Sequence, residues 1–117
     1  MHRLVVVLVA ALVAAPSAAA AGILDRAAAK LRSDSVYVDP AARSVMPPAA
    51  ERRIEREIET AGAGPVYVVV LPERAAREAG GDPVDALRTI AETLHRRGTC
   101  AGVIGNHFRA LSNVRCP

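Results

Sequence analysis

An unbroken apolar run, Val66-Tyr67-Val68-Val69-Val70-Leu71, lies near the middle of this 117-residue chain, between Pro65 and Pro72. Its residues are β-branched, aromatic or leucine, which favours a strand. The run does not alternate between apolar and polar residues, as a strand with one solvated face would. It therefore predicts a strand that is buried on both faces, as in parallel sheets covered by helices.

An amphipathic helix is predicted before this strand. Pro47-Pro48 opens it, because proline is tolerated in the first turn of a helix, and Gly62 ends it. Its apolar residues recur at three- and four-residue spacing and form a narrow stripe of Ala50, Ile54, Ile58 and Ala61.

A second helix is predicted after the strand, beyond a polar connection from Glu73 to Gly81. Asp82 is a good N-cap, and Pro83 suits the first helical position. We expect His95-Arg96-Arg97 to fill the last turn, where positive charge complements the helix dipole, and Gly98 to end the helix. The apolar face consists of Leu87, Ile90, Ala91 and Leu94.

Two further strands complete the pattern. Residues 35–38 form a short β-branched and aromatic run, and residues 99–104 form another that Gly105-Asn106 ends. Strands that alternate with helices predict the α/β class. We expect a small three-layer domain with a parallel sheet of about three strands, in the order βαβαβ, joined by right-handed crossovers.

The N-terminus predicts export. Met1-His2-Arg3 is a short positive start, and residues 4–15 are an unbroken apolar run that is too short to cross a bilayer. The small residues Ala18 to Ala21 then offer the Ala-x-Ala spacing that signal peptidase accepts. Residues 1–21 are therefore predicted to be a signal peptide with an apolar helix. The alternative is an uncleaved anchor that extends to Leu24.

The remaining chain divides into three segments. Residues 22–34 are a helical lead-in, residues 35–111 are the α/β domain, and residues 112–117 are a tail. The lead-in is predicted from apolar residues at helical spacing, which are Ile23, Leu24, Ala27, Ala28 and Leu31.

Composition and charge argue against two function classes. The formal net charge is only +3, and several arginines, such as Arg52 and Arg56, stand beside carboxylates. The few aromatic residues do not interleave with the arginines, so we expect no nucleic-acid partner. Gly62-Ala63-Gly64 precedes a strand, and Gly80-Gly81 is followed by the carboxylate of Asp82. Neither is a phosphate loop, so the chain has no nucleotide motif.

Cys100 and Cys116 are the only cysteines. An exported protein can keep a disulfide, and the loop between these two would be short. Cys100, however, begins a predicted buried strand, which favours a small buried hydrophobe there and an unpaired thiol in the tail.

Polar residues follow each predicted strand. Ligand sites of open parallel sheets lie at the carboxyl ends of the strands, where carboxylate, amide and imidazole groups can together coordinate a divalent cation. The alternative is that Asp39 caps a turn and that the other side chains are solvated. The predicted metal-site residues are Asp39, Glu73, Asn106 and His107.

The whole pattern resembles the TPM domain, a module named for thylakoid-lumen and photosystem-repair proteins. The resemblance covers about residues 31–111. Asp39 matches the acidic residue that follows the family's first strand, and Gly105-Asn106-His107 matches the polar stretch after its third. The resemblance implies an exported or membrane-tethered α/β module that binds a divalent cation, with phosphatase activity proposed for some members.

Three functions follow. The first is an exported, non-catalytic module, secreted or membrane-tethered, that binds a cation, an envelope protein or the membrane. The second is a metal-dependent phosphatase with Asp39 as a ligand and His107 as a proton donor. The third is a truncated fragment of a longer membrane protein, because the family continues for another helix and strand.

We predict that the exported protein begins between Ala20 and Gly22, because the small residues that signal peptidase requires lie just before these positions. N-terminal sequencing of the secreted or envelope product measures this. An intact Met1 in the membrane fraction would identify residues 1–21 as an anchor instead.

Overall fold

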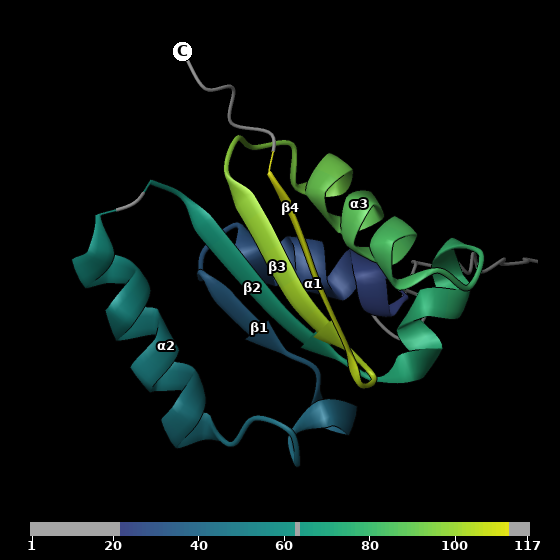
Figure 1. The fold of residues 1–117 in the computed structure, drawn as a ribbon, viewed down its shortest axis with the longest axis horizontal. Helices are drawn as coiled ribbons and strands as arrows, with labels where there is room; N and C mark the ends of the chain where they lie inside the picture. The colour runs from purple at the N-terminus through teal and green to yellow at the C-terminus, as the bar shows by residue number, and fades with distance from the viewer. Residues whose placement is uncertain (1–21, 63, 113–117) are drawn as a thin grey trace, which may run out of the picture.

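A computed structural model describes residues 22–62 and 64–112 (Figure 1). The predicted signal peptide, residues 1–21, and the tail residues 113–117, with Cys116, lie outside the described residues. In the described part of the chain, no helix is both long enough and apolar enough to span a membrane.

A four-stranded sheet forms the middle of three layers (Figure 1). Its strands, in spatial order, are β1 (Val36–Val38), β2 (Val66–Leu71), β3 (Thr99–Ile104) and β4 (His107–Ser112). The first three strands are parallel, as predicted, and β4 runs antiparallel to β3. The helices are α1 (Ile23–Leu31), α2 (Pro48–Ala61) and α3 (Pro83–Leu94), with the 3₁₀ helices η2 (Pro40–Ala42) and η3 (Glu73–Ala79). The three-layer α/β prediction is confirmed, but the sheet is mixed.

Strand β4 is the element that the sequence analysis missed. Gly105-Asn106 forms a two-residue loop, so that Ile104 pairs with His107. Gly105 has a φ of 65°, which glycine adopts without the steric cost that a Cβ brings, and glycine in the first loop position is typical of a tight hairpin turn. The chain therefore returns along β3, and His107 lies in a strand instead of a loop.

The helices divide between the two faces of the sheet. Val69 and Leu71 lie in a core cluster with α1, η3 and α3, whereas Val70 lies in a second cluster against which Ile54 and Ile58 of α2 pack. Because β1, β2 and β3 lie side by side in chain order, crossovers on opposite faces have opposite hands. The expectation of two right-handed crossovers is therefore wrong for one of them. Helices α1 and α3 fill the first face, which leaves α2 only the second.

The apolar patterns of the sequence predict the buried residues correctly on the face of the sheet that α1 and α3 cover. All five lead-in residues predicted to form a stripe are buried in α1. On β2, Val69 and Val70 point to opposite faces and are 1% and 0% exposed, so the second half of this strand is buried on both faces. Its first half, residues 66–68, is only half-buried. On the side of Val68 and Val70, the covering helix α2 has a narrow apolar stripe and no buried residue of its own.

The end of α3 differs from its prediction. The helix stops at Leu94, and His95 is its C-cap, with a φ of 59° and its N–H donating to the Ala91 carbonyl at 3.1 Å. Gly98 does not end the helix. It allows β3 to approach Pro65 closely, since a Cβ at this position would lie 2.7 Å from the Pro65 carbonyl oxygen. Because Gly98 is needed for this close approach of β3 to the start of β2, the connection uses residues 96–98, and the basic residues lie outside the helix.

Cys100 is a buried free thiol, 6% exposed, in the cluster formed with α1 and α3. Burial raises the pKa of this thiol above its usual value. The prediction of a small buried hydrophobe at this position is confirmed.

We expect Val69→Asp to prevent folding, because it places an unpaired charge where the side chain has no access to water. Thermal melting followed by circular dichroism measures this. Val45→Asp is the matched control, since Val45 is 57% exposed and its variant should melt like the parent. A cooperative melt of Val69→Asp near the parent temperature would contradict the burial of β2.

Candidate functional site

Asp39, the first residue of the predicted metal site, is held by groups of the protein. It is 2% exposed and is the only buried charged residue in the described part of the chain. Its Oδ1 accepts the backbone N–H of Ala41 at 2.9 Å, which caps η2. Its Oδ2 accepts the hydroxyl of Tyr37 at 3.2 Å and lies 3.7 Å from a guanidinium nitrogen of Arg26. The alternative prediction, a turn cap before Pro40, is confirmed.

The Asp39 carboxylate thus joins three elements: α1 through Arg26, β1 through Tyr37, and η2 through Ala41. Partial burial raises the pKa of the Tyr37 phenol, and the neighbouring carboxylate raises it further, while Arg26 opposes both effects. The phenol therefore stays protonated at neutral pH and can act as a hydrogen-bond donor to Asp39.

The other predicted ligands lie at the same end of the sheet. The N–H of Asp39 donates to the Val70 carbonyl, and the N–H of Gly105 donates to the Leu71 carbonyl. A Cβ at Gly105 would lie 3.0 Å from the Cβ of Glu73, so the β3–β4 turn contacts the start of η3. The predicted common edge is therefore correct for the backbone.

The four side chains differ in their surroundings, since Asp39 is buried and the others reach the surface. Glu73 and Asn106 are exposed, and His107 is half-buried in β4. Within residues 22–62 and 64–112, no three or more histidine, cysteine, aspartate or glutamate side chains are grouped so that they could hold a metal ion. The prediction that these residues converge on one cation stays a prediction, and in this structure Asp39 is directed to Tyr37 and Arg26.

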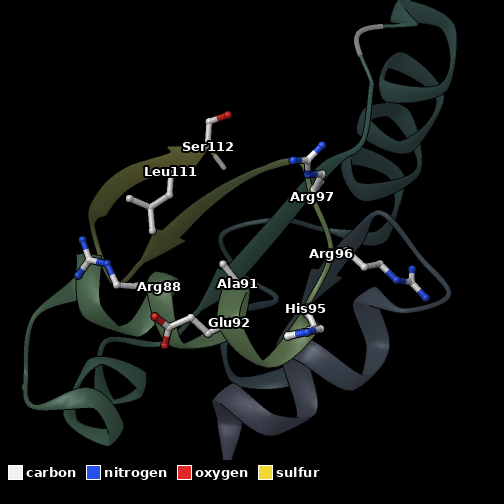
Figure 2. Close-up of a pocket in the computed structure, with 8 residues that line it drawn as sticks. All are labelled: Arg88, Ala91, Glu92, His95, Arg96, Arg97, Leu111 and Ser112. Carbon is white, nitrogen blue, oxygen red and sulfur yellow. The ribbon is translucent and has the colours of Figure 1, made fainter. Parts of the chain in front are cut away.

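A groove that the sequence analysis did not predict lies between α3 and β4 (Figure 2). Its volume is about 490 Å³. Ala91 of α3 and Leu111 of β4 supply its apolar floor, with Arg88 on one side of them and Arg97 on the other (Figure 2). The residues that line it are Arg88, Ala91, Glu92, His95, Arg96, Arg97, Leu111 and Ser112.

The groove is basic, because three arginines and one glutamate line it. Arg88 is half-exposed and pairs with Asp85 on its own helix at 2.7 Å. Exposed pairs of this kind contribute little to stability, so Arg88 can exchange Asp85 for the carboxylate of a ligand at small cost. Arg96 donates to the backbone carbonyl of Arg32 at 3.0 Å and so connects this end of α3 to the end of α1.

Neither a family model nor a curated protein nor a solved structure matches this chain. The resemblance to the TPM domain therefore stays a prediction. Of the two places described above, the α3–β4 groove is the better candidate site, because protein groups already occupy the Asp39 carboxylate at the sheet edge.

We expect Asp39→Ala to lower the free energy of unfolding by roughly 1–3 kcal/mol without any metal present, because it leaves the Tyr37 hydroxyl and the Ala41 N–H without their acceptor. Urea denaturation measures this. Asp39→Asn is the matched control, because it keeps an acceptor for the cap and should lose less. An Asp39→Ala variant as stable as the parent would show that the carboxylate is not a structural group.

Proposed function

We propose that this chain is an exported, non-catalytic binding module of the cell envelope, and that the groove between α3 and β4 is its binding site. The observation that carries the proposal is the groove itself. An apolar floor of Ala91 and Leu111 with polar groups around it is the combination typical of ligand sites.

The three arginines of the groove are suited to the recognition of an anion. Guanidinium groups bind carboxylates through paired hydrogen bonds and stay protonated at any ordinary pH, so they hold an anion but do not move a proton. The phosphatase alternative requires Asp39 as a metal ligand, and that carboxylate is already held by Tyr37, Ala41 and Arg26.

The envelope location in this proposal is supported by the predicted signal peptide and by the resemblance to the TPM domain. A protein partner is favoured over the membrane, since the site is a groove between a helix and a strand, and a groove accepts a peptide segment better than it accepts a flat surface.

We expect random twelve-residue peptides displayed on phage to be enriched by the mature domain, and the enriched peptides to weaken by about tenfold or more against Leu111→Ser. The reason is that burial of a leucine side chain contributes roughly 1.5–3 kcal/mol. Isothermal titration calorimetry measures the affinity, and the thermal melt of the variant shows whether it is folded.

Val45→Ser is the matched control, because Val45 is an apolar residue that is 57% exposed and lies between η2 and α2, away from the groove. It should bind like the parent. Amide chemical shifts should change in residues 83–97 and 107–112. The proposed site is refuted if no peptide is enriched, or if the shifts change elsewhere.

A further inference from the structure

The outer side of β4 is an open sheet edge. Among the described residues, β4 pairs with one strand, β3. The two residues that flank a two-residue turn, here Ile104 and His107, form a backbone hydrogen-bonded pair. From there along an antiparallel ladder, hydrogen-bonded pairs alternate with pairs that share no hydrogen bond. The backbone groups of Phe108 and Ala110 therefore point outward, away from β3.

One side-chain contact agrees with this assignment. The guanidinium of Arg109 donates to the carbonyl of Phe108, the residue before it, at 2.8 Å. A charged side chain that covers an edge carbonyl protects a sheet from unwanted pairing. A ligand strand that took over this carbonyl would release Arg109 to bind the ligand's own side chains.

The groove runs beside this edge. Gly102 and Arg109 are partners across β3 and β4, as are Cys100 and Leu111, so Arg109 and Leu111 lie on the face of the sheet that α3 covers. A strand added along β4 would point every second side chain to this face, between Arg88 and Arg97 (Figure 2).

The opposite face of the same edge is apolar and uncovered. Phe108 is 65% exposed and Ala110 is exposed, both on the side of the sheet where α2 lies. Side chains of an added strand that point to this face would pack beside Phe108, as neighbours across a strand pair do. The two faces together favour a ligand that alternates acidic and apolar residues.

We propose that the groove and the β4 edge are one site, and that it binds an extended acidic peptide as a fifth strand of the sheet. This inference rests on the proposed function and names its ligand. Backbone hydrogen bonds to Phe108 and Ala110 supply affinity, while carboxylates that bind Arg88 and Arg97 supply selectivity.

The test uses the acetylated and amidated peptide Val-Glu-Val-Leu-Val-Glu-Val, which in extended form places glutamate, leucine and glutamate on one face. Fluorescence anisotropy should show saturable binding that weakens at high salt. The same peptide with lysine in place of glutamate should bind at least tenfold more weakly. Equal binding of the two peptides overturns the inference.

Charge reversal tests the groove side. Arg97→Glu should weaken the glutamate peptide and strengthen the lysine peptide, whereas Arg52→Glu on the exposed face of α2 should change neither. N-methylation of the peptide backbone tests the edge. Methylation of the alternate amides that would donate to β4 should abolish binding, whereas methylation of the amides that point away from β4 should not. Equal effects of the two sets overturn the strand-addition mode.

Failure of the inference is distinguishable from failure of the proposed function. Library peptides that bind in the groove without acidic preference overturn the inference and leave the proposed function in place. Failure of both library and designed peptides overturns both. A dimer through β4, detected by light scattering, that prevents all peptide binding also overturns the inference, because the edge would then belong to a second copy.

Discussion

The burial of β2 on both faces is the constraint on which the rest of this fold depends. Val69 and Val70 point in opposite directions and neither contacts water, so each face of the sheet needs a helical cover. Close strand contact imposes a further requirement. A Cβ at Gly102 would lie 2.7 Å from a methyl carbon of Val69, so a larger residue at this position would push β3 away from the central strand.

The two covers are unequal, and this inequality creates the candidate site. Helices α1 and α3 form a continuous apolar core with β2 and β3, whereas α2 packs by Ile54 and Ile58 against a smaller cluster of β1 and β2 residues. Strand β4 therefore lies with one face beside α3 and the other face toward solvent, where Phe108 is exposed. The groove forms because α3 lies beside β4, and the outer side of β4 stays open because no described helix covers it.

Most of the fold was predictable from the sequence, because it is specified by local signals. The Asp82 N-cap and the stripe of α1 each act within one element, and both predictions are confirmed. The Val66 run is confirmed as a strand, and its second half is buried on both faces. Strand β4 has a weaker signal, since residues 107–112 include no β-branched side chain. Gly105-Asn106 between two runs was the hairpin signal that could have found it.

The candidate site was less predictable, because its residues meet only after the chain has folded. Arg26 and Asp39 lie on different elements, and no local pattern connects them, so the carboxylate was assigned to a cation and not to an arginine. The groove likewise requires the end of α3 and the strand β4 together. The sequence predicted that α3 continues through Arg97, which would place Arg97 in the last helical turn. It did not predict β4, the strand that brings Leu111 to the groove.

Helix α1 has a role in the groove although it contributes no residue to the groove's lining. Its core residues pack with α3, the guanidinium of Arg32 donates to the Thr93 carbonyl, and Arg96 donates to the Arg32 carbonyl. The ion pair of Arg26 with Asp39 fixes the same helix to the sheet. The wall of the groove is therefore connected to both β1 and α1 before any ligand arrives. A site whose walls are already positioned loses little conformational entropy on binding, which favours a short peptide as the proposed ligand.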